Sequence, residues 1–233
     1  MARNRTVAAD GTPQAPSEFT RVRRLGKRGA YDRTTLYAIL DAGTHCHVAH
    51  VIDGRPVAMP TLHWRHGEHL YWHGNAASRM LGANAAGGEV CVTVTLIDGF
   101  VLARSGFNHS INYRSAMCFG VPTEITDEAA KNSALKHFLD HWLPGRWDTL
   151  RPATRKELRA TRVLSIPLDE FSAKVREGGP HDPEVDARWP TWAGVIPLVT
   201  RPAAAIPADD YQGRQAPPRL APFATRRRAR PAR

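Results

Sequence analysis

The segment EVCVTVTLI (89–97) alternates strictly between apolar and small or polar residues. One face of an extended chain would carry Val90, Val92, Val94 and Leu96, and the other Cys91, Thr93 and Thr95. A period of two residues is typical of a β-strand with one buried face. The segment therefore predicts a strand that packs against a core and has at least one neighbouring strand.

Other β-type runs follow one another through short turns. Asp53-Gly54 separates residues 45–52 from residues 55–64, and Asp98-Gly99 predicts a second hairpin turn. The remaining predicted strands are 69–74, 100–105, 112–125, 161–168 and 192–198. About seven mainly antiparallel strands joined in this way predict a barrel or a sandwich.

Four helices interrupt the strands. The first, at residues 32–43, has Asp32 or Thr34 as its cap, and a second begins at Asn75. Thr126 is the expected cap of the helix at 126–142, and TRKE (154–157) is a capping-box pattern.

Composition divides the chain into one folded domain, residues 21–200, and two arms, 1–20 and 201–233. The arms are rich in Pro, Ala and Arg and are expected to be disordered. The formal net charge is +10, with arginines concentrated at both ends of the chain. Nucleic-acid binding remains an alternative, but a solvated tail is favoured because the arginine-rich segment 225–233 has no aromatic platform.

Three isolated cysteines, no apolar run near ~18 residues and no apolar leader favour a reduced cytoplasmic protein without a membrane span. GxGxxG, GxxxxGK[ST], HExxH and GxSxG are all absent from the sequence. His45 and His47 share a strand face but have no third ligand, so no metal site is expected.

The segment NAASRM (75–80) combines a helix start with a hydroxyl and a guanidinium. Backbone N–H groups at a helix start attract anions, and an arginine fork suits phosphate. Ser78 and Arg79 therefore form a candidate phosphate site, with a simple capped helix as the alternative.

Several long segments, in order, resemble the pyridoxamine 5′-phosphate oxidase-like family, in its flavin-nucleotide-binding branch. They are RRLGKRGAYDRTTLYAILDAG (23–43), HGNAASRM (73–80), VCVTVTLIDGFVLARSGFNHSINYRSAMCFG (90–120), LPGRWDTLRPATRKELRATRVLSIPLDEFSAKVREGGP (143–180) and WAGVIPL (192–198). The resemblance implies a mainly β fold with a few helices, a six- to seven-stranded antiparallel split β-barrel. It also implies a homodimer that binds FMN in grooves between the subunits.

The resemblance assigns FMN contacts to residues on several parts of the chain. The phosphate would meet Ser78, Arg79 and Met80, where Met80 replaces a lysine of the oxidases proper. The flavin would lie beside Met59, Pro60, Thr61 and Leu62, with Trp72 and His73 closing over the ribityl chain and phosphate. The resemblance also retains Trp192. The polar side chains of Tyr113, Arg114 and Ser115 are further candidates for the phosphate or the flavin edge. The alternative is that Arg114 makes an interface ion pair and that His109 and Asn112 bond the loop backbone.

The expected activity is an FMN-dependent oxidoreductase that acts on an unidentified small molecule. His109 is the candidate catalytic residue, because imidazole can deliver a proton near neutral pH. Two alternatives stay open: a flavin-binding protein for storage or sensing, and a haem-binding relative with a histidine ligand.

Overall fold

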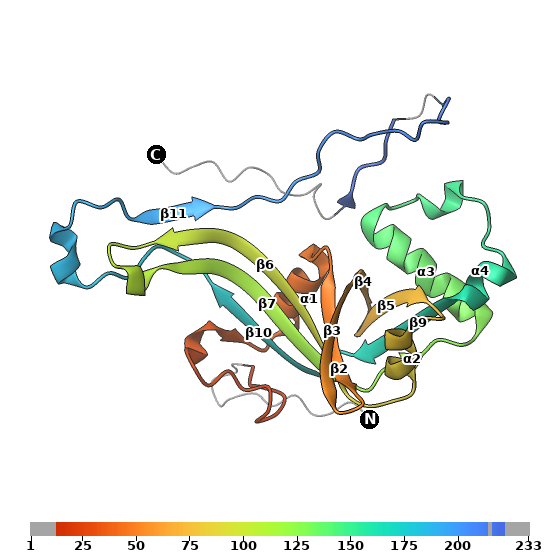
Figure 1. Cartoon of the computed structure of the whole chain (residues 1–233), viewed down its shortest axis with the longest axis horizontal. Coiled ribbons are helices and arrows are strands. Elements are labelled where there is room, and N and C mark those ends of the chain that lie inside the picture. Colours follow the sequence, from red (N-terminus) through yellow and green to blue (C-terminus); the bar gives the residue numbers. More distant parts are fainter. Residues whose placement is uncertain (1–12, 214–215, 222–233) are drawn as a thin grey trace.

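The computed structural model describes residues 13–213 and 216–221 (Figure 1). This part of the chain forms two antiparallel sheets and four α-helices. The seven-stranded sheet has the order β1-β10-β7-β6-β2-β3, and β11 also pairs with β6. The four-stranded sheet has the order β4-β5-β9-β8. The predicted fold class, a mainly β antiparallel split barrel with a few helices, is confirmed.

The larger sheet contains β1 (Gly29–Ala30), β2 (Cys46–Ile52), β3 (Arg55–Thr61), β6 (Val90–Leu102), β7 (Ser110–Gly120), β10 (Glu170–Arg176) and β11 (Gly194–Pro197). The smaller sheet contains β4 (His63–His66), β5 (His69–Asn75), β8 (Thr123–Glu124) and β9 (Thr161–Pro167). The α-helices are α1 (Arg33–Ala42), α2 (Arg79–Ala85), α3 (Glu128–Trp142) and α4 (Arg155–Ala160). Short 3₁₀ turns are η1 (Gly26–Arg28), η2 (Gly106–Asn108), η3 (Trp147–Thr149) and η4 (Glu184–Arg188).

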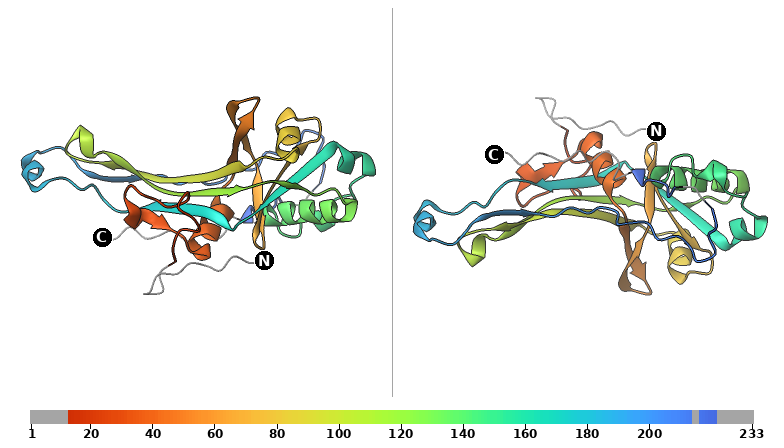
Figure 2. Two further views of the ribbon diagram at one scale, coloured as in Figure 1. Left: turned by 90° about the horizontal axis from the view of Figure 1, so that it is seen from below. Right: turned by 90° about the horizontal axis from the view of Figure 1, so that it is seen from above.

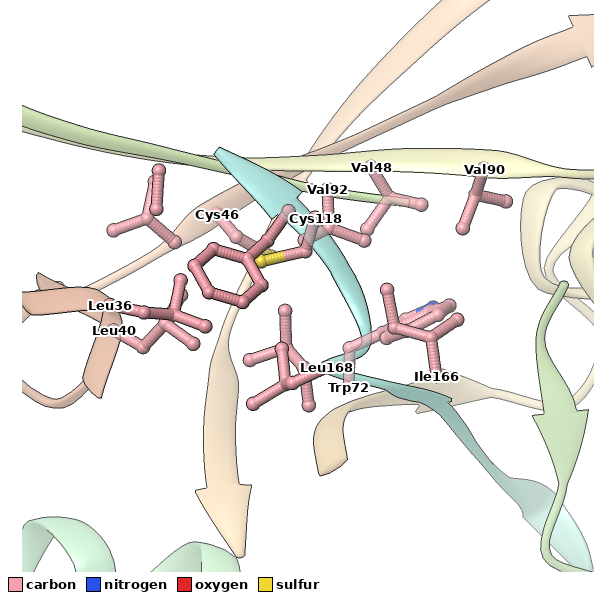
Figure 3. Close-up of a cluster of buried hydrophobic side chains, with 14 of the residues drawn as sticks. Leu36, Leu40, Cys46, Val48, Trp72, Val90, Val92, Cys118, Ile166 and Leu168 are labelled. Carbon is pink, nitrogen blue, oxygen red and sulfur yellow. The ribbon is translucent and has the colours of Figure 1, made fainter. Parts of the chain in front are cut away.

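The core lies between the two sheets and α1 (Figure 3). Val48, Val90 and Val92 point into it from the larger sheet, as the alternating pattern predicted, and Trp72 and Ile166 point into it from the smaller sheet. Fully burying one such side chain contributes about 1.5–3 kcal/mol, so this cluster is the main source of stability.

α3 covers the other face of the smaller sheet. The buried residues there are Trp64, Ala134 and Val163, and the Trp64 ring stacks on Tyr71 at 5.4 Å between centroids. The two faces of the smaller sheet therefore pack against two separate apolar clusters.

The predicted hairpin turn at Asp98-Gly99 is wrong. β6 runs through both residues, and a register shift between Ile97 and Gly99 marks a β-bulge there. A Cβ on Gly99 would lie 2.9 Å from the carbonyl oxygen of Ile196. The glycine therefore permits the close approach of β11 and does not turn the chain.

Two predicted helix caps are also wrong. α2 begins at Arg79 with Ser78 as its cap, because the Ser78 Oγ accepts from the Leu81 N–H at 3.4 Å. Asn75 ends β5 and accepts from the Ala77 N–H at 2.8 Å, which forms a local turn. Asp127, one residue after the predicted cap Thr126, caps α3.

The other caps are confirmed. Asp32 caps α1, and Thr154 and Glu157 form the predicted capping box of α4.

Part of the predicted N-terminal arm falls within the described residues. Thr20 is buried, Ser17 donates a hydrogen bond to Glu170, and the Phe19 ring meets Phe119 edge-on with centroids 4.9 Å apart. The rest of the predicted arms, residues 1–12, 214–215 and 222–233, lies outside the described residues.

None of the helices in the described residues is long and apolar enough to cross a membrane. Cys46, Cys91 and Cys118 are free thiols, and burial raises the pKa of Cys46 to about 12.

Candidate functional site

A hollow of about 500 Å³ lies between the β2–β3 turn and the start of α2. Its lining consists of Ile52, Asp53, Arg55, Val57, Arg79 and Met80. Two of these residues, Arg79 and Met80, are in the predicted phosphate site. The third, Ser78, caps the helix that begins at Arg79.

Local backbone geometry creates this hollow. Asp53 and Gly54 both have positive φ, 50° and 74°, which makes the tight turn between β2 and β3. The turn leaves Arg55 at the start of β3, on the lining of the hollow with the first helical residue of α2.

The lining has an excess of positive charge. The Arg79 Nη2 lies 3.0 Å from the Asp53 Oδ2, and the two side chains are 77% and 83% exposed. Arg55 makes no salt bridge with any residue that the structure describes. Two guanidinium groups and one carboxylate suit a bound anion. The Ser78 oxygen accepts from the helix backbone, so its hydroxyl hydrogen is still free to donate.

Sequence reasoning missed Arg55. An arginine directly after a turn is expected to be a solvated surface residue. Only the tertiary structure shows that Arg55 shares a hollow with Arg79.

The predicted flavin-contacting segment of β3 alternates between core and surface. Met59 packs against the core, whereas Pro60 is exposed. Thr61 donates to the His73 carbonyl at 3.5 Å, and Leu62 is exposed beyond the strand. The outward residues of β3 are thus available to a ligand, and the inward ones hold the strand in place.

A second hollow of about 630 Å³ adjoins the first, because Val57 lines both. Its lining is mainly apolar and includes Ala49, Ala58, Cys91 and Phe119. The sequence offered no signal for it, because these residues come from four different strands or their edges.

Trp72 and His73 point to opposite faces of β5. Trp72 is fully buried in the core (Figure 3), and its indole N–H has no hydrogen-bond partner among the residues that the structure describes. His73 lies on the α3 side, with its ring 4.6 Å from that of Phe138. Burial lowers the pKa of His73, so its imidazole is neutral at pH 7.

The β7 residues are held by neighbouring strands. The Arg114 guanidinium makes two hydrogen bonds to Asp98, at 2.8 and 2.7 Å, and this pairing raises the pKa of Arg114. Ser115 donates to the Lys174 carbonyl at 3.4 Å, and Tyr113 lies opposite Arg176 in the sheet.

His109 lies at the tip of the β6–β7 hairpin and is exposed. Its Nδ1 donates to the Ser105 carbonyl at 2.8 Å, so Nδ1 carries a hydrogen. The Nε2 lone pair of the neutral ring is therefore free. Trp192, just before β11, is exposed and lies close against Gly194.

The predicted site residues form two groups in one chain. Ser78, Arg79 and Met80 lie at the start of α2, which shares a hollow with the start of β3, and the segment 59–62 follows along that strand. His109 and Trp192 belong to the far end of the β6–β7 hairpin and β11 (Figures 1 and 2). A single chain does not bring these groups together.

Comparison with known structures gives two strong similarities. The flavocytochrome Anf3 from Azotobacter vinelandii is 42% identical, with a TM-score of 0.84 over 88% of this chain and 96% of that one. The FAD and heme binding protein from Mycobacterium smegmatis is 40% identical, with a TM-score of 0.78 over 82% and 94% of the two chains.

A putative 5-nitroimidazole antibiotic resistance protein from Bacteroides thetaiotaomicron shares the fold, with 24% identity and a TM-score of 0.52 over 63% of this chain and 86% of that one. No match was found among curated proteins. The family model described as pyridoxamine 5′-phosphate oxidase matches residues 32–175, which is more than half of the chain. The chain therefore belongs to the pyridoxamine 5′-phosphate oxidase family.

Proposed function

We propose that this protein is a flavin-nucleotide oxidoreductase that works as a homodimer. The observation that carries the proposal is the cationic hollow at Arg55 and Arg79, which opens beside an apolar hollow along β3. The names of the two relatives at 40–42% identity, a flavocytochrome and a FAD- and haem-binding protein, support it.

Each hollow suits one part of a flavin nucleotide. Arg79, Arg55 and the Ser78 hydroxyl would hold the phosphate on the ribityl chain. The apolar surface at Val57, Ala58 and Cys91 would take the flat ring system. A bound flavin supplies reversible two-electron transfer.

FMN is the cofactor expected from the sequence, whereas the similarity to a FAD- and haem-binding protein favours FAD. Both nucleotides carry the ribityl phosphate, so the cationic hollow suits either. Chromatography of the cofactor released from purified protein distinguishes the two.

The separation of the predicted site residues supports the proposed homodimer. In a two-fold pair, the hairpin end of one chain, with His109, Tyr113 and Trp192, would complete the site around α2 of its partner. His109 would then hold a proton at Nε2 for the substrate when its ring is protonated. Sedimentation of the flavin-loaded protein should give twice the mass of one chain, and a stable loaded monomer would contradict this arrangement.

Arg79→Ala tests the phosphate site directly. A charge-assisted contact to phosphate contributes about 1.5–3 kcal/mol, but Arg79 is exposed and already paired with Asp53. We expect FMN binding to weaken by about tenfold, the lower end of that range. Riboflavin lacks the phosphate, so its affinity should stay the same.

The matched control is Arg151→Ala, which removes an exposed arginine paired with Glu157 elsewhere on the surface. Fluorescence titration of apoprotein measures the affinities for FMN and riboflavin in the wild type, Arg79→Ala and Arg151→Ala. Equal weakening of both ligands by Arg79→Ala would show that Arg79 supports the fold and not the phosphate.

A haem group is a second candidate cofactor, in addition to the flavin. The similarity to a flavocytochrome and to a FAD- and haem-binding protein favours it. Two histidines of this chain suit an iron ligand: His109, whose Nδ1–H is bound to a carbonyl, and His73, whose burial keeps it neutral. The test is a Soret band in the visible spectrum of the purified protein. If the band is lost in either His109→Ala or His73→Ala, that histidine is the iron ligand. If the wild type shows no Soret band after reconstitution with hemin, haem is excluded.

Turnover distinguishes an oxidoreductase from a protein that only stores or senses flavin. Chemically reduced protein should be reoxidised by an added electron acceptor in repeated cycles. A single unrepeated reoxidation would favour storage.

A further inference from the structure

The loop before β1 carries a group of cations that have no acidic partner. Arg23, Arg24, Lys27 and Arg28 make no salt bridge within the described residues, whereas the neighbouring Arg21 pairs with Glu18 at 2.6 Å. Lys174 joins the group, because its Nζ donates to the Arg24 carbonyl at 3.3 Å. These five residues are called the cationic loop surface below.

An apolar side chain lies in the middle of this surface. Leu25 is 50% exposed and has a left-handed backbone, with φ 56° and ψ 49°. This conformation costs a non-glycine residue about 1–2 kcal/mol. The loop is held in it by the Arg28 N–H, which donates to the Leu25 carbonyl at 2.9 Å, and by the pairing of β1 with β10. In a protein-binding surface at this loop, Leu25 would lie at the apolar centre and the cations at the polar rim.

The cationic loop surface borders residues of the predicted flavin site. Lys174 lies opposite Ser115 in the β10–β7 pairing, and directly opposed side chains share one face of a sheet. Two residues further along β10, Arg176 lies opposite Tyr113 on the same face. Arg176 is buried, and its partners are the Asn112 side chain and the Gly178 and Gly179 carbonyls, with no carboxylate among them. Cationic side chains therefore continue from the loop along β10, the strand that pairs with β7.

We propose that the cationic loop surface docks an acidic one-electron carrier protein that supplies electrons to the bound cofactor. The proposal rests on the proposed flavin function. It explains why unpaired cations surround an exposed leucine next to β7. The chain also has no GxGxxG fingerprint for a dinucleotide electron donor.

A protein partner is favoured over nucleic acid. Nucleic-acid surfaces combine cations with aromatic side chains that stack on bases, or with a helix or ribbon that enters a groove. The loop presents an aliphatic leucine, and the hydroxyl of the nearby Tyr31 is engaged with the Val22 N–H at 2.7 Å. Electron-transfer encounters use small interfaces guided by charge, which suits a surface made of a few unpaired cations.

Two reduced carrier molecules bind in turn and each loses one electron. The two electrons, with two protons from solvent, reduce the flavin to its two-electron form, and the substrate reoxidises it.

Charge reversal on the loop tests the docking. The probe is a plant-type [2Fe–2S] ferredoxin, which is acidic, and the matched variants are Arg24→Glu/Lys27→Glu and Lys156→Glu/Arg159→Glu. The second pair makes the same change of net charge on α4, at the other end of the molecule, where both residues are exposed and make no salt bridge within the described residues (Figure 1). Affinities are measured by interferometry at low and at moderate salt on the purified protein.

We expect the wild type to bind ferredoxin and to lose affinity as salt rises, since exposed charges are screened. The loop variant should bind at least about tenfold more weakly, while the α4 variant stays within about twofold of the wild type. Leu25→Ala should speed dissociation without changing the salt dependence.

The proposal would be overturned by equal weakening in both charge reversals, by no effect of the loop variant, or by a DNA duplex that displaces ferredoxin and itself depends on Arg24 and Lys27. The binding assay needs no flavin, so a protein that binds ferredoxin but holds no flavin would contradict the proposed function alone. Flavin-loaded protein that fails to bind ferredoxin would contradict the docking alone.

Discussion

Arg79 and Asp53 face each other across the candidate phosphate hollow, with Nη2 and Oδ2 3.0 Å apart. The first begins α2 and the second lies in the β2–β3 turn. An exposed pair of this kind contributes at most about 1 kcal/mol to stability. A phosphate bound in the hollow would compete with the Asp53 carboxylate for the same guanidinium.

Asp53→Asn should therefore tighten FMN binding, by about two- to fivefold. Asparagine tolerates the left-handed backbone at this position, so the turn should be retained. Titration of apoprotein with FMN and with riboflavin checks this, and riboflavin affinity should not change. Weaker FMN binding in the variant would show that the carboxylate itself orders the site.

The strands with strong alternation could be predicted from the sequence, and those with polar composition could not. Residues 90–97 and 161–167 are strands as expected. β10 (EFSAKVR) was missed, because Glu, Ser, Ala and Lys have weak β propensity and only Phe171 and Val175 indicate its inward face. Its pairing along β7, and not its composition, makes it a strand.

Turn and cap signals were ambiguous where two residues offered the same chemistry. Asn75 and Ser78 are both good caps, and the pairing of β5 with β9 extends to Asn75, which leaves Ser78 to cap α2. An Asp-Gly pair turns the chain after β2 but makes a bulge in β6, because β7 and β11 hold that strand on both sides.

The candidate site could also be predicted only in part from the sequence. The family resemblance located Ser78 and Arg79, but Arg55 and the apolar hollow depend on contacts between distant segments. The family itself is confirmed, whereas the role of each site residue stays a prediction.

Arg114 and Asp98 should be coupled in a double-mutant cycle of Arg114→Met and Asp98→Asn. The bidentate pair bridges β6 and β7, and its side chains are partly buried, so we expect a coupling energy of about 1 kcal/mol in urea unfolding. If Arg114 also contacts flavin, only Arg114→Met should weaken flavin binding. No coupling would mean that the two side chains are separately solvated.

Gly43→Ala should destabilise the protein by about 1–3 kcal/mol, because the core there has no room. Its backbone is ordinary, with φ −74°, but a Cβ would lie 2.4 Å from the Val94 Cγ1 and 3.2 Å from the His63 Cε1. The control is Gly26→Ala, where a Cβ meets nothing within 4 Å, and this variant should be neutral. Thermal unfolding compares the two, and equal melting temperatures would show that α1 shifts without cost.

His63 should make the protein less stable in mild acid. Burial lowers the pKa of His63 to about 4, and its Nε2 donates to the Leu40 carbonyl at 2.9 Å. In the unfolded chain the pKa of this histidine is about 6.5. Between pH 6.5 and pH 4, His63 therefore binds a proton in the unfolded chain but not in the folded protein. Stability contributed by the neutral ring is thus complete above pH 6.5 and is lost as pH falls toward 4.

From pH 7 to pH 5 this loss should be about 2 kcal/mol in the free energy of unfolding. His63→Gln keeps a hydrogen-bond donor but does not titrate, so its own stability should fall less over the same interval, even if the variant is less stable at pH 7. Urea unfolding of both proteins at pH 7 and pH 5 measures the difference in slope, in which other titrating groups cancel. Identical pH dependence in the two proteins would mean that His63 is already exposed to protons in the folded state, through opening of α1 away from β4.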